Sequence, residues 1–212
     1  MKKFNIYKFL ENRPLSFSAF NSFSDPQWGS PQKWYDSYIL GKRQTSKELT
    51  FGSQIDKQFQ DDPTFLSDIP RIGGFQSEMR AVLELGKKKV YLLGFADQKG
   101  TNEIRDLKTG KNPWTQKKAD ETKQLTFYAL LAYLIDGIPP ELMDFYIDYV
   151  PTYERADLSI DFVRPIKAQT FKTKRTMTDI ILLCAEIDKT VKAMQATCDK
   201  MNKVYNKTKV ER

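Results

Sequence analysis

The most constraining feature of this 212-residue sequence is a change of hydrophobic period near Phe75. From Phe75 to Leu85 most side chains alternate between apolar and polar, which is typical of a β-strand with one buried face. The segments 89–98 and 103–109 also favour strands, and turn residues at 99–102 separate them. Such short connections join antiparallel neighbours. We therefore predict an antiparallel three-strand meander.

Helical patterns lie on both sides of this meander. Residues 15–41 are rich in aromatic side chains and N-cap candidates, but Pro26 and Pro31 break them into short helices. Further elements are expected in chain order: a helix at about 48–60, a helix at 119–136 that Gly137 ends, and strands at 145–150 and 160–163. The fold class predicted is α/β (α+β), a mixed sheet flanked by helices.

An apolar stripe marks the C-terminal region. Its members recur at spacings of four and three residues: Ile180, Cys184, Ile187, Val191, Met194, Cys198, Met201 and Tyr205. This heptad pattern predicts one long helix within residues 170–208. The stripe fits a helix packed on its own domain, and it also fits a coiled coil or partner surface, which would make the chain a helical scaffold.

The length of the chain suits one domain with a single core. We expect residues 1–212 to form that domain, with a helical part (1–70), a sheet-and-helix part (71–165) and the long helix (170–208). No apolar run reaches the roughly 20 residues of a membrane span. The charged N-terminus lacks the apolar core of a signal peptide. We expect a cytoplasmic protein without a membrane partner.

The sequence contains no histidine. This excludes Ser-His-Asp triads, histidine-ligated zinc hydrolases and histidine general bases. Cys184 and Cys198 are expected to be core thiols and are too few for a four-cysteine zinc or iron–sulfur site. Hydrolysis would rest on carboxylates, lysine or an oxygen-bound metal. The formal net charge of +7 favours a polyanionic partner, although a basic surface without such a partner explains it equally well.

Two acids and a lysine are predicted to meet at one end of the sheet. Asp106 and Lys108 lie two residues apart on a strand, so their side chains share a face, while Leu107 points to the other. Asp97 ends the preceding strand, and a hairpin of this length can bring it beside Asp106. Close carboxylates need a cation to stay ionised, and oxygen ligands suit Mg²⁺ or Mn²⁺. An Asp-x-Lys sequence on a strand is also common as an exposed ion pair.

Five sequence matches in order give this cluster a family resemblance. They are residues 15–20 (LSFSAF), 51–56 (FGSQID), 94–97 (GFAD), 104–111 (IRDLKTGK) and 124–128 (QLTFY). Together they resemble the RecB-type branch of the PD-(D/E)XK nuclease superfamily over roughly residues 15–150. The resemblance implies a restriction-endonuclease-like core. It also implies that Asp97 and Asp106 bind a metal, with the Leu107 carbonyl as a further ligand, and that Lys108 is the catalytic lysine.

The resemblance extends to supporting residues. Gln124 and Tyr128, four apart on one helix face, would hold the lysine, the substrate phosphate or the scissile strand, with helix packing as the alternative. Asp56 stands where the family usually has a histidine, and it is either a metal ligand or a surface acid. Glu78 is an extra acidic candidate for a second metal or a solvent-facing strand residue. No cysteine precedes Pro26, where iron–sulfur members carry one, so no iron–sulfur cluster is expected.

Basic and aromatic residues follow the acidic motif. They could line a path for a phosphate backbone and stack on a base, or form a solvated helix start: Lys111, Trp114, Lys117, Lys118 and Lys123. Three upstream aromatic residues are candidates for a wall over the site, with core packing favoured for at least two of them: Trp28, Trp34 and Tyr35.

The sequence therefore predicts a Mg²⁺- or Mn²⁺-dependent deoxyribonuclease. The resemblance suggests an exonuclease acting on single strands or duplex ends in phage or mobile-element recombination and repair, and leaves room for a recombination partner protein. The alternative, prompted by Asp56, is a non-catalytic module that keeps the fold and binds nucleic acid or a partner.

Overall fold

The computed structural model describes residues 4–27, 29–42 and 45–210, with side chains described up to residue 203. Two units account for the chain. Unit 1 comprises Met1–Gln44, Arg80–Leu93 and Ile181–Arg212, and unit 2 comprises Thr45–Met79 and Gly94–Ile180. Within the described ranges, no helix is long and apolar enough to cross a membrane.

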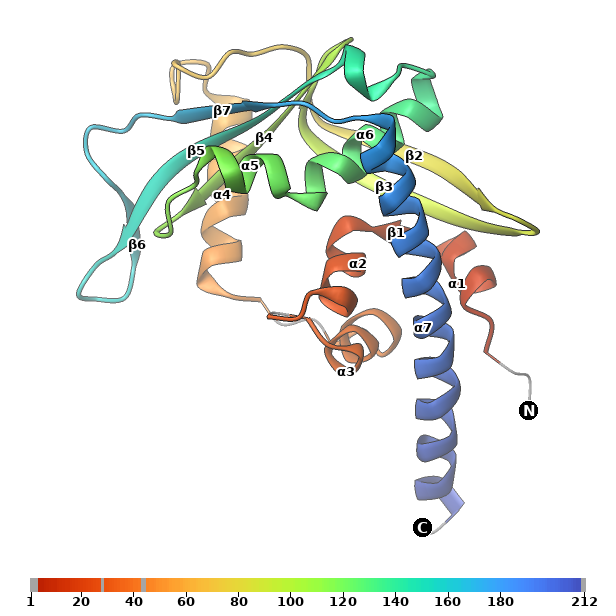
Figure 1. The fold of residues 1–212 in the computed structure, drawn as a ribbon. Helices are drawn as coiled ribbons and strands as arrows, with labels where there is room; N and C mark the ends of the chain where they lie inside the picture. Colours follow the sequence, from red (N-terminus) through yellow and green to blue (C-terminus); the bar gives the residue numbers. More distant parts are fainter. Residues whose placement is uncertain (1–3, 28, 43–44, 211–212) are drawn as a thin grey trace. The chain divides into compact units, whose positions relative to one another are not determined.

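The sheet of unit 2 is mixed (Figure 1). β3 (Lys88–Lys99) ends antiparallel to β4 (Glu103–Gly110), and β4 runs parallel to β5 (Asp144–Glu154) along its whole length. β7 (Gln169–Thr173) pairs antiparallel with the first half of β5, and β6 (Ile160–Phe162) with its last residues. This arrangement agrees with the mixed sheet that the sequence predicts.

The predicted meander is present. β2 (Gly74–Leu85) pairs with β3 after a two-residue turn at Gly86 and Lys87, and Gly86 takes the left-handed φ of +62° that such a turn needs. β5 runs four residues past the predicted 145–150, because β6 supplies backbone partners for Thr152 to Glu154.

Helices α4 (Lys47–Asp61) and α6 (Lys123–Asp136) cover opposite faces of β4. Leu107 belongs to a buried apolar cluster with Ile55 and Phe59 of α4. The neighbouring Asp106 accepts a hydrogen bond from α6 instead. Because successive strand residues point to opposite faces, the acidic side of the motif faces α6.

The helix predicted at 119–136 is two helices, α5 (Gln116–Glu121) and α6, separated by Thr122 in an extended conformation. Arg175 explains the break. Its guanidinium donates to the backbone oxygen of Ala119 at 2.9 Å and to that of Thr122 at 3.1 Å, so these carbonyls have partners without a continuous helix. As predicted, α6 ends at Gly137, with a φ of +69°. A short 3-10 turn, η2 (Pro140–Leu142), precedes β5.

Unit 1 holds the short N-terminal elements. They are α1 (Ile6–Asn12), β1 (Leu15–Ser16), α2 (Phe17–Ser24), α3 (Pro31–Trp34) and the π-helical turn η1 (Tyr35–Ile39). β1 pairs parallel with Leu92 and Leu93 of β3, which belong to the same unit. Short helices were predicted here. Pro31 begins α3, because Ser30 caps it and proline suits the first helical position.

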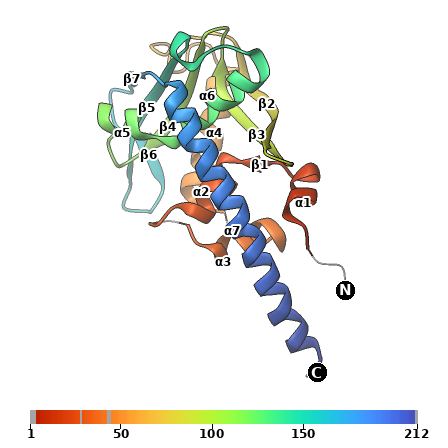
Figure 2. The ribbon, with the colours of Figure 1, turned by 45° about the vertical axis from the view of Figure 1, so that its right-hand side comes forward.

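The predicted C-terminal helix is α7 (Met177–Val210), one long element in Figures 1 and 2. Its apolar stripe packs on its own chain: Ile187, Val191, Met194 and Cys198 are fully buried. Gln195 joins it to the N-terminus, accepting from the Ile6 amide at 2.8 Å and donating to the Phe4 carbonyl at 2.8 Å. This burial fits the prediction of a helix packed on its own domain. The side chain of Tyr205 lies outside the described residues.

Candidate active site

A glycine lets α6 lie against the strand that carries Asp97. A Cβ on Gly94 would lie 2.6 Å from Leu131 Cδ1 and 3.2 Å from Tyr128 Cε1, closer than van der Waals contact allows. Close packing brings the Tyr128 hydroxyl to the Phe95 backbone oxygen, to which it donates at 2.7 Å. The glycine of the sequence motif therefore has a packing function, and Tyr128 anchors α6 to β3.

Asp106 is the centre of the polar cluster, and its side chain is almost fully buried. Its Oδ2 lies 2.5 Å from Lys108 Nζ, and its Oδ1 accepts a hydrogen bond from Gln124 Nε2 at 2.9 Å. Gln124 Nε2 also donates to the Tyr128 hydroxyl at 2.9 Å. The structure thus brings together Asp106, Lys108, Gln124 and Tyr128, as the sequence predicts.

Asp97 joins the same cluster through the backbone of β4. Its Oδ2 accepts a hydrogen bond from the Leu107 amide at 2.7 Å, between Asp106 and Lys108 in the chain. Its Oδ1 accepts from Gln76 Nε2 at 2.9 Å. The hairpin therefore does place Asp97 beside β4. Sequence reasoning did not find Gln76, whose only signal is the Gly73-Gly74 pair where its strand begins.

The electrostatics of the cluster favour an added cation. Burial raises the pKa of Asp106, and the nearby Lys108 only partly opposes this. Burial and the charge of Asp106 together raise the pKa of Asp97 to about 7. Burial alone would lower the pKa of Lys108, but Asp106 and Asp97 outweigh it and the net shift is upward. One ammonium group therefore does not fully compensate the buried carboxylates.

Asp56, on α4, lies within the field of this cluster. Burial raises the pKa of its carboxyl to about 6, Lys108 opposes that shift and Asp106 adds to it. In the described part of the chain, no hydrogen bond or ion pair joins Asp56 to Asp97, Asp106 or Lys108. Asp56 is thus close enough to interact electrostatically but is not part of the contact network.

The donor set fits a hard divalent cation. Asp106 Oδ2 is buried, and the Lys108 ammonium at 2.5 Å is its partner. No three or more His, Cys, Asp or Glu side chains of the described residues are grouped to hold a metal. Mg²⁺ is commonly bound by one or two carboxylates, with water and substrate phosphate completing its shell. Asp97 and Asp106 supply those carboxylates.

Trp114 and two of the predicted lysines gather at α5. Together with Thr115, Glu121 and Thr122, they line an open hollow of about 310 Å³. Lys118 Nζ lies 4.4 Å from the centre of the Trp114 ring, and Lys117 lies 3.8 Å from Glu121. Lys123, at the start of α6, is exposed. The hollow thus combines an aromatic ring with basic side chains.

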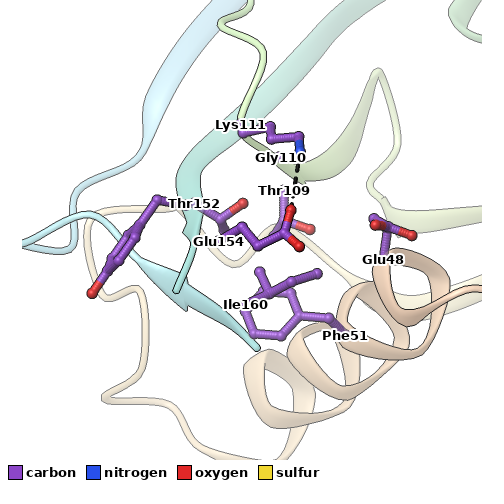
Figure 3. Close-up of a pocket in the computed structure, with 9 residues that line it drawn as sticks. Glu48, Phe51, Thr109, Gly110, Lys111, Thr152, Glu154 and Ile160 are labelled. Carbon is purple, nitrogen blue, oxygen red and sulfur yellow. Dashed lines mark hydrogen bonds and ion pairs between the residues drawn. The ribbon is translucent and has the colours of Figure 1, made fainter. Parts of the chain in front are cut away.

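Lys111 has a closer acidic partner than Lys117. Figure 3 shows Lys111 Nζ directed at Glu154, with 3.2 Å between Nζ and Oε2. Lys47 pairs with the other oxygen of the same carboxylate. Glu154 and Lys111 line a cavity of about 50 Å³ with Phe51, Thr109 and Ile160 among its other walls. The charge of Lys111 is therefore partly compensated.

Four other candidates lie apart from the cluster or outside the description. Glu78 is exposed on β2 and is not among the charges that shift the pKa values of Asp56, Asp97, Asp106 or Lys108. Trp34 and Tyr35 are buried in unit 1, and Trp34 meets Phe23 edge to face at 5.3 Å. They pack in the core, as favoured for at least two of the three aromatics. Trp28 lies outside the described residues.

Comparisons with known proteins relate the chain to others by structure. No protein-family model matches the sequence, and no curated protein matches it. An exonuclease candidate from Eubacterium rectale superposes with a TM-score of 0.58 at 12% identity, covering 92% of this chain and 84% of that one. An alkaline exonuclease from Laribacter hongkongensis gives 0.52 at 11% identity, covering 96% and 98%. A phage-related exonuclease from Haemophilus somnus 129PT gives 0.50 at 16% identity, covering 82% of each chain.

At these identities the likeness establishes a shared fold. The mixed sheet flanked by helices, predicted from the sequence as a restriction-endonuclease-like core, is thereby confirmed.

Proposed function

We propose that this chain is a Mg²⁺- or Mn²⁺-dependent deoxyribonuclease of the PD-(D/E)XK superfamily, in or near its RecB-type branch. The observation that carries the proposal is the meeting of Asp97, Asp106 and Lys108 on adjoining strands, where two buried carboxylates share one ammonium group. The fold shared with the exonuclease structures supports it.

Asp97 and Asp106, with the Leu107 carbonyl and Asp56 as further ligands, would hold the cation. A bound divalent ion lowers the pKa of a coordinated water and offsets charge that develops on a phosphate. Lys108, 2.5 Å from Asp106, would orient the attacking water or stabilise the transition-state charge.

Gln124 and Tyr128 support these groups. Gln124 fixes one oxygen of Asp106, while the other contacts Lys108 and would also bind the cation. The Tyr128 hydroxyl donates to the Phe95 carbonyl, and this bond holds α6, which carries Gln124, against β3. Glu78 has no role in this proposal, since it lies outside the cluster.

The substrate we infer is DNA with a single-stranded segment or an end. The Trp114 hollow offers a ring for base stacking and two lysines for phosphates, and base–aromatic stacking needs an unpaired base. The fold shared with an alkaline exonuclease and a phage-related exonuclease motivates exonuclease action. Recombination and repair, with a partner protein in that process, is the setting we propose.

The test is digestion of end-labelled single- and double-stranded DNA, each linear and circular, with Mg²⁺ or Mn²⁺. Loss of the linear substrates with survival of the circles supports an exonuclease. Cutting of the circles supports the same chemistry in an endonuclease. If DNA is bound but no substrate is cut with either ion, the enzyme proposal is wrong and the non-catalytic binding module replaces it.

A further inference from the structure

Gln76 has an unusual backbone for its residue type. It lies near the start of β2 with a φ of +47°, in the left-handed region that favours glycine. Its side chain is exposed, so burial does not impose this conformation. Backbone strain of this kind persists where surrounding contacts fix the segment, and it is concentrated at functional sites.

The segment before Gln76 is clamped onto the end of β3. The buried side chain of Gln98 accepts a hydrogen bond from the Ile72 amide and donates one to the Pro70 carbonyl, both at 3.1 Å. A Cβ on Gly73 would lie only 2.2 Å from the Lys99 carbonyl oxygen, so only glycine permits this approach. The chain therefore enters β2 at a fixed point beside the strand that carries Asp97.

The left-handed turn at Gln76 brings its amide to Asp97. Its Nε2 donates to Asp97 Oδ1 at 2.9 Å, while the Leu107 amide donates to Oδ2 at 2.7 Å. With a donor on each oxygen, the plane of the carboxylate is set. The amide of glutamine is neutral, so it does this without adding a positive charge that would compete with a cation.

We propose that Gln76 is a positioning residue that orients Asp97 for binding of the divalent cation. This inference rests on the proposed function, because it concerns the metal site assigned there. Without the amide, Asp97 is held through Oδ2 alone and its Oδ1 is free to turn. Groups that orient a metal ligand typically contribute about 10- to 100-fold to metal affinity or activity.

Gln76→Gly separates the amide from the strained backbone. Glycine adopts a positive φ without strain, so this variant should unfold at the same temperature as the original chain or higher. Titration calorimetry of the full chain with Mn²⁺ should nevertheless show a Kd raised about 10-fold or more. The Mn²⁺ concentration for half-maximal DNA cleavage should rise in parallel.

Leu158→Gly is the matched control. Leu158 also has a positive φ, +65°, and is exposed in the connection between β5 and β6. Replacing it with glycine relieves the same kind of strain but removes no contact to Asp97, so the Kd for Mn²⁺ should not change.

The outcomes separate the two proposals. If the original chain binds Mn²⁺ and cleaves DNA, and Gln76→Gly binds Mn²⁺ as tightly, the role of Gln76 is wrong while the proposed function stands. An equal loss of affinity in Leu158→Gly also overturns that role, because the effect would then be general. If the original chain neither binds Mn²⁺ nor cleaves DNA, both proposals fall.

Discussion

Two neighbouring residues of β4, Arg105 and Asp106, belong to two buried ionic clusters. The clusters differ in how fully their charges are paired. In the first, Arg105 Nε and Nη2 bond to the two oxygens of Asp148 at 2.8 and 2.9 Å. Glu103 and Thr170 complete the contacts at 2.7 and 2.6 Å. Every charge in this cluster has a directed partner, so it resembles a structural network.

The charges of the second cluster, around Asp106, are only partly compensated. Asp106 and Asp97 share one ammonium group, and their pKa values are raised. A protein built only for stability would gain by completing or removing such a cluster. Buried charge alone therefore does not mark a site, whereas buried charge left uncompensated does.

Asp106→Asn should produce the largest effect. We expect cleavage of DNA to fall by about 10³-fold or more, because a ligand charge and the partner of Lys108 are lost together. The free energy of unfolding should fall by less than the roughly 3–5 kcal/mol expected for breaking a fully buried pair, because Lys108 keeps the nearby charge of Asp97. Initial rates with Mn²⁺ and urea unfolding measure the two quantities. Retention of the full rate would show that the site is elsewhere.

Asp148→Ala should show the opposite pattern, a large loss of stability with little change in the cleavage rate. Leaving Arg105 buried without its main partner should lower the free energy of unfolding by about 3–5 kcal/mol. The rate per folded molecule should be almost unchanged. Urea unfolding measures the loss, and the double variant Arg105→Met/Asp148→Leu should recover most of it. A loss below about 1 kcal/mol would contradict the structural function of this network.

The stability of the metal-free chain should depend on pH through the second cluster. Asp97 and Asp56 have folded-state pKa values of about 7 and about 6, above the ordinary value of 3.8. The folded state therefore holds more protons than the unfolded state between about pH 4 and 7. Each unit of raised pKa corresponds to about 1.4 kcal/mol, so the unfolding free energy should fall by several kcal/mol as pH rises through this window, with the smaller share from the partly exposed Asp56.

Urea unfolding in EDTA across this pH range measures the slope, and Asp97→Asn is the control that should flatten it. Saturating Mg²⁺ should flatten it as well, since a bound cation stabilises the ionised carboxylates. A steeper fall in Asp97→Asn than in the original chain would contradict the assignment.

The smallest expected effects concern the lysines. These residues also differ in how far an acidic side chain compensates their charge. Lys118→Ala should reduce the slope of log affinity against log salt on single-stranded DNA by about 0.7. Lys117→Ala and Lys111→Ala should change it less, because Glu121 and Glu154 pair with these ammonium groups. Fluorescence titrations at several salt concentrations would decide, and a larger effect for Lys111 would reverse the ranking.

Patterns within short stretches of sequence predicted the elements whose formation depends on neighbouring residues. Alternation located β2, the spacing of apolar residues located α7, and the Asp-x-Lys motif located Asp106 and Lys108 on one strand face. The ordered motifs also predicted that Asp97 and Gln124 lie close to these residues. The contacts of the described residues agree with that prediction.

The remaining features depend on residues far apart in the chain. The break between α5 and α6 follows from Arg175, more than fifty residues beyond Thr122, and no window of sequence near 122 contains it. β1 and β7 are too short to carry a period, and they form because β3 and β5 offer them an edge. Gln76 reaches Asp97 through a backbone conformation that its residue type does not favour.

The most direct test of the central claim is the location of a divalent cation in crystals of the chain grown with Mn²⁺. An anomalous difference map should show one peak at coordination distance, about 2.0–2.3 Å, from oxygens of both Asp97 and Asp106. A map without a peak between these carboxylates, with the Lys108 ammonium still on Asp106, would contradict the account.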